Sequence, residues 1–163
     1  MNIQIELISE SDLADASFNI VIDGLKPRET YRVEMFLSDY YCINAPMLLA
    51  HDVLWRSTGT FVSDKNGIID ISQTPSCSGS YEGISTMGLF FNAKPLTNQR
   101  KKLPNTLSEI PILDHFFVDI KIMQGNTVIA ERTFTRHYMS SQISHKDIYG
   151  KYFQGRLFYD KRQ

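Results

Sequence analysis

Cysteine is scarce in this sequence: its 163 residues include two, Cys42 and Cys77. Small disulfide scaffolds carry more cysteines at conserved-looking spacings, so an apolar core must hold this chain together. We interpret both thiols as free and typical of a reducing compartment. Cys77 lies in a Ser/Gly-rich stretch, and nothing in the sequence brings a histidine to it, so we do not expect a Cys–His nucleophile.

Long hydrophobic runs and an excess of one charge are also missing. No apolar run approaches the roughly 20 residues that cross a bilayer. The first six residues show neither the basic region nor the apolar core of a signal sequence. With 17 basic and 18 acidic residues the net charge is -1, which gives no electrostatic reason to bind nucleic acid or an anionic membrane. We therefore expect a cytoplasmic protein with neither partner.

Helical periodicity is absent, and hydrophobic residues recur with a period of two instead. In the segment 30–38, for example, Tyr31, Val33, Met35 and Leu37 alternate with more polar positions. Such alternation presents one apolar face of a strand to a core. We predict one all-β domain over residues 1–163, a sandwich of about eight or nine strands. The expected strands are 2–8, 16–22, 30–38, 53–62, 67–72, 87–93, 115–123, 127–136 and 152–159.

Turn residues separate these strands. Asp64-Lys65-Asn66-Gly67 predicts a tight hairpin between 53–62 and 67–72, because Asn-Gly tolerates positive φ angles. Gln124-Gly125-Asn126 predicts a second hairpin. Residues 47–51 could form one short helical turn. The stretch 95–111, rich in Pro, Asn, Lys and Thr, predicts an exposed loop, in which the basic run 100–102 is interpreted as solvated although it could attract phosphates.

Catalytic and metal signatures are missing as well. The nearest string to a nucleophile elbow is Gly79-Ser80-Tyr81-Glu82-Gly83, which has Tyr instead of Ser at its centre and precedes a predicted strand. Zinc sites use closely spaced ligand pairs, whereas the four histidines are scattered. We therefore predict no catalytic, cofactor-binding or metal-binding residue in this chain. The histidines are His51, His115, His137 and His145.

The most informative segment is residues 79–91, in which a Gly-Ser-Tyr-X-Gly loop leads into Met87-Gly88-Leu89. It resembles the signature of the N-terminal domain of the acyl-CoA thioesterases and bile acid-CoA:amino acid N-acyltransferases. Other similarities follow in family order, namely Gly24-Leu25-Lys26-Pro27, Trp55-X-Ser57-X-Gly59-X-Phe61, the turn at Asp64 and Gly67, Thr135-Arg136 and Gly155-Arg156-Leu157-Phe158. The last of these resembles the segment that opens the family's catalytic domain.

The resemblance implies an immunoglobulin-like β-sandwich that is not itself catalytic. It also implies a partner in the same polypeptide, an α/β-hydrolase domain that would bind acyl-CoA and cleave or transfer the acyl group. No such domain is present in these residues, so the chain is either a fragment or a natural single-domain relative. We expect the signature to dock on that domain and shape its substrate entrance, or else to turn the chain and fill the core. The candidate docking residues are Ser80, Tyr81, Gly83, Met87, Gly88 and Leu89.

Two other interpretations of the sequence remain open. Immunoglobulin-like folds host many activities, so a stand-alone module that binds protein or carbohydrate is an alternative. A homodimer is another, because open sandwiches expose strand edges that can pair.

Overall fold

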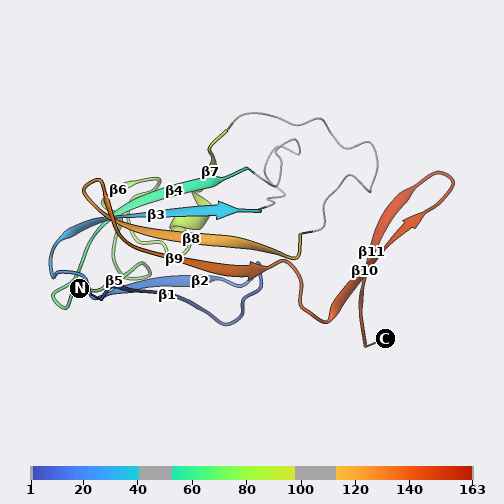
Figure 1. Ribbon diagram of the computed structural model, residues 1–163, viewed down its shortest axis with the longest axis horizontal. Helices are drawn as coiled ribbons and strands as arrows, with labels where there is room; N and C mark the ends of the chain where they lie inside the picture. The colour runs from blue at the N-terminus through green and yellow to red at the C-terminus, as the bar shows by residue number, and fades with distance from the viewer. Residues whose placement is uncertain (1, 41–52, 98–112, 163) are drawn as a thin grey trace.

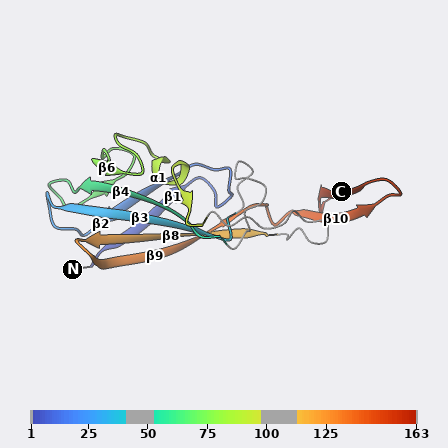
Figure 2. The same ribbon diagram turned by 90° about the horizontal axis from the view of Figure 1, so that it is seen from above.

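The computed structural model describes residues 2–40, 53–97 and 113–162, which form a β-sandwich and a separate hairpin (Figure 1). The smaller sheet has the order β1-β2-β5, and the larger has the order β6-β4-β3-β8-β9, with β7 also paired to β4. Figure 2 shows the two sheets as stacked layers. Their strands are β1 (Gln4–Ser9), β2 (Phe18–Asp23), β3 (Thr30–Ser38), β4 (Trp55–Val62), β5 (Ile69–Asp70), β6 (Ser78–Gly79), β7 (Lys94–Pro95), β8 (His115–Gln124) and β9 (Thr127–His137).

The period-two pattern places the core between the sheets. In β4 every second side chain, from Trp55 to Phe61, is buried, and the residues between them face outward. The inner positions of β2, β3 and β8 meet them in one apolar cluster. Burial of each such side chain contributes about 1.5–3 kcal/mol. The all-β sandwich predicted from the sequence is therefore confirmed, whereas its immunoglobulin-like detail stays a prediction.

Glu34 is the exception to the alternation in β3, because it is buried on the outer face of the large sheet. Its Oε1 accepts hydrogen bonds from Arg32 Nε at 2.9 Å and from Arg56 Nη2 at 2.8 Å. A buried carboxylate needs such partners to offset the loss of water.

Two arginines of β9 close the side of the sandwich. Arg132 Nη1 donates to the Ile5 carbonyl at 2.7 Å. The Arg136 guanidinium, which is 1% exposed, donates to the carbonyls of Ser11, Leu13 and Ala16. The turn between β1 and β2 is thereby fixed against the larger sheet.

Two predictions about the strands are wrong. Residues 87–93 contain a short helix, α1 (Gly88–Phe91), instead of a strand. The turn at Asn66-Gly67 is present, with Gly67 at φ 80°, but β5 pairs with β2 and not with β4. The turn leads from β4 in the larger sheet to β5 in the smaller one. Leu25 N donates to the Gly67 carbonyl at 3.0 Å, and this bond holds the turn beside the end of β2.

The second predicted hairpin is confirmed. β8 and β9 pair up to Gln124 and Thr127, with Gly125 at φ 60° in the two-residue turn. Positive φ at the first of two turn residues is the geometry of a type II′ hairpin, which glycine adopts without strain.

A further hairpin consists of β10 (Ile143–Tyr149) and β11 (Gln154–Asp160). β11 corresponds to the predicted strand 152–159, whereas β10 was missed because its alternation is broken by His145, Lys146 and Asp147. Figures 1 and 2 show this hairpin extending away from the sandwich. Among the described residues, no helix has the length and apolar character needed to cross a membrane. The predicted helical turn at 47–51, Cys42, His51 and the basic run at 100–102 lie outside the described residues.

Candidate functional site

The signature loop, defined here as residues 76–91, begins by extending the edge of β4. Gly79 pairs with Gly59, and at φ 126° a β-carbon on Gly79 would lie 2.4 Å from the Thr58 carbonyl oxygen. Ser80 continues the contact, since its N–H donates to the Thr58 carbonyl at 2.8 Å and its Oγ accepts from the Thr58 N–H at 2.9 Å. The first glycine and the serine of the signature therefore anchor the loop to the large sheet.

Two aromatic rings fill the space behind this edge, and two glycines make room for them. A β-carbon on Gly59 would lie 2.6 Å from the Phe61 ring, and one on Gly88 would lie 2.4 Å from Cζ of Tyr81. The rings of Phe61 and Tyr81 meet edge to face, with 6.5 Å between centroids. Burial raises the pKa of Tyr81 to about 12, because the phenolate would lose its water. Gly88, which lies in α1, thus permits a close approach by the side chain of Tyr81.

The second half of the signature closes one end of the core. Met87 Sδ accepts a weak hydrogen bond from the Phe18 N–H at 3.3 Å, and Leu89 is buried. The ring of Phe90 lies edge-on to those of Phe18 and Tyr40, with centroid distances of 5.6 and 5.4 Å. These contacts hold α1 against both β2 and the segment after β3.

The outer surface of the loop is exposed around Gly83. Gly83 adopts φ 86° and exchanges two backbone hydrogen bonds of 2.9 Å with Ser76, which is buried. Two large apolar side chains remain in solvent, Ile84 at 62% and Phe91 at 74% exposure. Neither was among the residues predicted from the sequence, although both are apolar residues within the signature and could have been included on that ground.

The structure therefore divides the six candidate docking residues into two groups. Ser80 and Gly83 are exposed, Gly88 and Leu89 are buried, and Tyr81 and Met87 are partly buried against the core. Full burial of both Tyr81 and Met87 would have removed the main support for docking, and it does not occur. The docking role stays a prediction, with the loop's exposed apolar surface now placed at Ile84 and Phe91.

Groups capable of acid–base chemistry gather elsewhere, at the end of the large sheet. His115 and His137 face each other across β8 and β9, with ring centroids 6.1 Å apart. His115 Nδ1 lies 2.5 Å from Asp114, and His137 Nε2 lies 3.7 Å from Asp12. The hydrogen bond from His115 holds the pKa of Asp114 below its usual value. A hollow of about 530 Å³ is lined by Asp12, Asp114 and His137 and also by Ser140 and Lys161.

No hydrogen bond joins Ser140 or Cys77 to an imidazole within the described part of the chain, so a nucleophile–base pair is not assembled there. In the same residues no group of three or more histidine, cysteine or acidic side chains is placed to hold a metal ion. The exposed thiol of Cys77 is free, as its loop position suggested.

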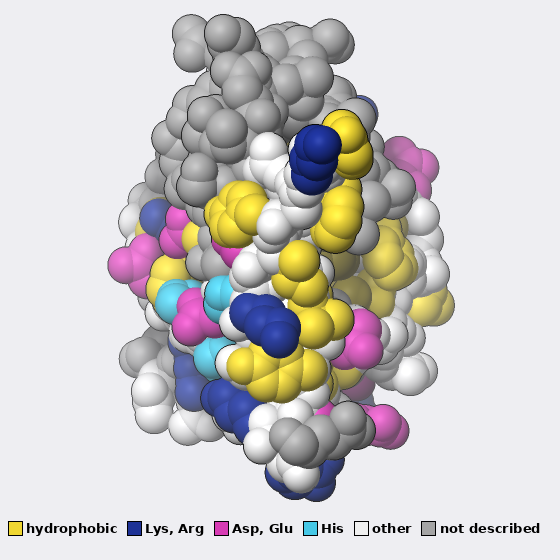
Figure 3. Space-filling model, turned by 90° about the vertical axis from the view of Figure 1, so that its right-hand side faces the viewer, with side chains coloured by type: hydrophobic (Ala, Val, Ile, Leu, Met, Phe, Trp, Pro, Cys, Tyr) yellow, Lys and Arg dark blue, Asp and Glu magenta, His cyan; other side chains and the backbone are white. Residues whose placement is uncertain are grey.

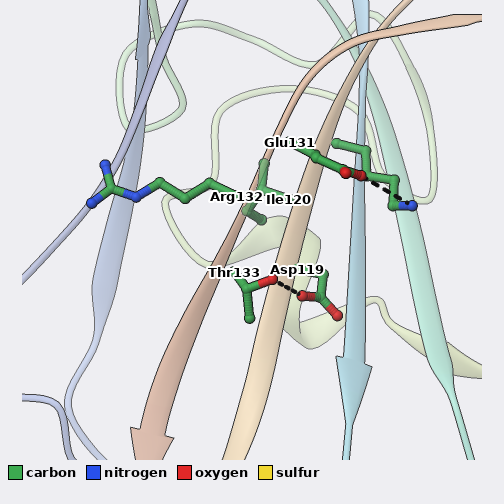
Figure 4. Close-up of a pocket in the computed structure, with 6 residues that line it drawn as sticks. Asp119, Ile120, Glu131, Arg132 and Thr133 are labelled. Atoms are coloured by element: carbon green, nitrogen blue, oxygen red, sulfur yellow. Dashed lines mark hydrogen bonds and ion pairs between the residues drawn. The ribbon is translucent and has the colours of Figure 1, made fainter.

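A second hollow, of about 470 Å³, lies over β8 and β9 (Figure 4). Thr133 Oγ1 donates to Asp119 at 2.5 Å, and Lys121 pairs with Glu131 at 3.4 Å. Arg132 extends the other way, toward β1 (Figure 4). These side chains form a hydrogen bond and an ion pair with each other across neighbouring strands, which is typical of a solvent-facing sheet surface.

The described residues form an all-β sandwich that carries the signature loop on the edge of its larger sheet, and comparison with known proteins gives the family. The family described as "Acyl-CoA thioester hydrolase/BAAT N-terminal region" matches residues 15–149. Because this match covers most of the sequence, the chain belongs to that family.

Curated relatives carry the same names. Mouse acyl-coenzyme A amino acid N-acyltransferase 2 is 27% identical over 95 residues, covering 58% of this chain and 20% of the relative. Mouse acyl-coenzyme A thioesterase 6 is 24% identical over 135 residues, covering 79% of this chain and 28% of the relative. Mouse acyl-coenzyme A thioesterase 3 is 25% identical over 137 residues, covering 80% of this chain and 28% of the relative. The match therefore spans less than a third of the length of these relatives.

Proposed function

We propose that this chain acts as a non-catalytic domain that docks on an acyl-CoA thioester hydrolase or acyltransferase domain and shapes its substrate entrance. The family membership supports this role, since the matched region is the N-terminal part of such enzymes and its relatives are named as thioesterases and N-acyltransferases. The partner would supply the nucleophile, the base and the oxyanion donors, and acyl-CoA would bind through that partner.

One observation carries the proposal. The signature loop is anchored rigidly from within, by Ser80 on β4 and by Tyr81 against Gly88, yet it leaves Ile84 and Phe91 in water. Rigid apolar side chains at a surface cost little entropy to immobilise, so they suit a permanent interface. A loop whose purpose was to fill the core would bury these two residues.

The test uses this chain together with the hydrolase domain of a relative such as mouse acyl-coenzyme A thioesterase 6. We expect the chain alone to release no thiol from acyl-CoA, and to bind the added hydrolase domain in a calorimetric titration. Ile84→Ser and Phe91→Ser should each weaken that binding by about tenfold. Ile8→Ser, which alters a β1 residue of similar exposure (53%), is the matched control and should bind as the unmodified chain does.

Two results would contradict the proposal. Turnover by the chain alone that disappears in Cys77→Ser or Ser80→Ala would make it an enzyme. Equal loss of binding in the Ile8→Ser control would show that the signature loop is not the docking surface.

A stand-alone binding module is a second candidate, because the β10–β11 hairpin displays a group of exposed aromatic side chains. Exposed aromatic side chains are a means of binding sugars or peptides, and Tyr and Trp are enriched where proteins meet. Glycan-array binding that is lost when Tyr152 and Phe153 are changed to Ser would favour this function over the first.

A further inference from the structure

His115 and His137 are brought side by side by the pairing of β8 with β9. They are directly opposite residues of the two strands, and their neighbours Phe116 and Arg136 are buried, so both imidazoles lie on the outer face of the larger sheet. The ring centroids are 6.1 Å apart, and the side chains are 38% and 40% exposed. Figure 3 shows histidine side chains beside acidic ones at this end of the molecule. The two residues are far apart in the sequence, which is why their spacing gave no metal signature.

The spacing of the two rings suits one metal ion between them. A zinc ion binds an imidazole nitrogen at about 2.0–2.1 Å, which places the centres of two coordinated rings roughly 5–5.5 Å apart at tetrahedral or trigonal angles. The observed separation is larger by about 1 Å or less, a gap that two exposed rings close by rotation about their side-chain torsions. Imidazole is a preferred ligand of zinc, copper and nickel. The pair therefore has the chemistry and the approximate geometry of two ligands to a transition metal.

Asp114 determines which nitrogen of His115 is free to bind a metal. Its Oδ1 lies 2.5 Å from Nδ1 of that ring, and this hydrogen bond holds the pKa of Asp114 below its usual value, so the carboxylate stays ionised. A carboxylate that accepts from Nδ1 keeps the proton of the neutral ring there and leaves Nε2 with a free lone pair. Histidines that bind metals commonly donate their other ring N–H to a carboxylate in this way.

Asp12 supplies a carboxylate beside the second imidazole. The turn that carries it is tied to β9, since His137 N donates to the Asp12 carbonyl at 2.8 Å and Ala14 N donates to the His137 carbonyl at 2.7 Å. Asp12 Oδ2 lies 3.7 Å from His137 Nε2, and two ligands of one tetrahedral zinc ion are about 3.4 Å apart. No three ligand groups already converge among the described residues, so binding requires the His115 ring to turn toward the pair that Asp12 and His137 form.

We propose that His115, His137 and Asp12 bind a divalent transition-metal ion such as Zn²⁺, with Asp114 positioning the imidazole of His115. With both rings neutral, the two carboxylates outnumber the one buried guanidinium near Asp12, that of Arg136, so the local charge favours a cation. The bound ion cross-links the ends of β8 and β9 to the turn between β1 and β2. The site lies at the edge of the larger sheet opposite to the signature loop, so failure of either proposal leaves the other standing.

Calorimetric titration with ZnCl₂ tests the site. The background chain carries His51→Ala, Cys42→Ser and Cys77→Ser, which remove other groups able to bind zinc. We expect one ion to bind per chain at neutral pH. Mg²⁺ and Ca²⁺ at the same concentration should not bind there, since both prefer oxygen ligands. Absence of saturable zinc binding would overturn the proposal.

Single substitutions in this background assign the ligands. His115→Ala, His137→Ala and Asp12→Asn should each weaken zinc binding by about tenfold or more. Asp114→Asn should weaken it by about tenfold, the lower end of what loss of such a partner costs. His145→Ala is the matched control, because it removes the remaining imidazole from β10, and it should leave the affinity unchanged. Unchanged affinity in both His115→Ala and His137→Ala, or an equal loss in His145→Ala, would show that zinc binds elsewhere.

Spectroscopy separates metal ligation from a merely structural role. Cu²⁺, which binds such ligands more tightly than Zn²⁺ does, should show hyperfine coupling to two imidazole nitrogens in its paramagnetic resonance spectrum, and to one in either histidine variant. Zn²⁺ should also raise the melting temperature of the background chain by mass action, and not that of His137→Ala, once circular dichroism has shown that this variant folds. Spectra without nitrogen coupling, or an equal thermal shift in His137→Ala, would refute ligation by these histidines.

Discussion

The ring of Tyr81 lies so close to Gly88 that a β-carbon at residue 88 would be 2.4 Å from Cζ of the tyrosine. The two residues are seven positions apart in the sequence, and their contact fixes the shape of the signature loop between them. The Gly in Met-Gly-Leu is therefore required by the Tyr in Gly-Ser-Tyr, and the two halves of the motif form one structural unit.

Gly88→Ala should destabilise the fold by about 1–3 kcal/mol, because the tyrosine ring is backed by Phe61 and cannot withdraw without cost. The measurement is the free energy of unfolding in urea. Gly155→Ala is the control, since a β-carbon there would meet nothing within 4 Å. Tyr81→Ala should remove most of the penalty of Gly88→Ala in a double-mutant cycle, and additive effects would show that the contact is not the cause.

The phenol of Tyr81 should lose its proton at a higher pH than an exposed tyrosine does. Burial raises its pKa to about 12, above the ordinary value near 10. Its neutral form therefore stabilises the fold fully below pH 10, and this contribution is lost as the pH rises from about 10 to about 12. The absorbance titration of the unmodified chain minus that of Tyr81→Phe should give a single midpoint near 12. A difference midpoint near 10 would show that the ring is solvated.

Asp64 should support the fold against acid. Its Oδ1 accepts from the N–H groups of Ile68 and Asn66, both at 2.8 Å, and the bond from Ile68 does most to lower its pKa. A lowered folded pKa means that the stabilisation is present above the unfolded value of about 3.9 and disappears as the pH falls through the folded one. Asp64→Asn should thus lower the urea midpoint at neutral pH and have a diminishing effect in acid. An equal effect at both extremes would contradict this explanation.

Substitution of Arg136 should lower the folding stability more than substitution at most other positions of the sandwich. It donates to three carbonyls of the β1–β2 turn and lies over the ring of Phe18, with 5.2 Å from Cζ to the centroid. Arg136→Met removes the guanidinium donors from all three carbonyls, of which the Leu13 carbonyl keeps a bond from the Ala16 N–H, and should cost about 3 kcal/mol or more. Faster hydrogen exchange at residues 11–16 would locate the damage. Arg162→Met, at an exposed site, should change the stability by less than about 0.5 kcal/mol.

The sequence predicted that the signature either docks on a neighbour or turns the chain and fills the core, but it did not predict which of its residues are buried. Gly, Ser and Tyr at 79–81 indicated a tight loop, and Met-Gly-Leu indicated apolar packing. Whether Ile84 and Phe91 face water depends on α1, and its four residues are too short for a periodic signal to distinguish helix from strand. The same apolar run therefore predicted a strand over 87–93.

The sequence by itself determined the all-β class, eight of the strands and the turns at Asn66-Gly67 and Gly125, because alternation and turn chemistry are local properties of neighbouring residues. The tertiary structure decided which strands pair. β5 joins β2 because Gly67 is bonded to Leu25 across the molecule, and Arg136 is buried because three distant carbonyls need its donors. Such contacts link residues far apart in the chain, where no local pattern of side chains specifies the partner.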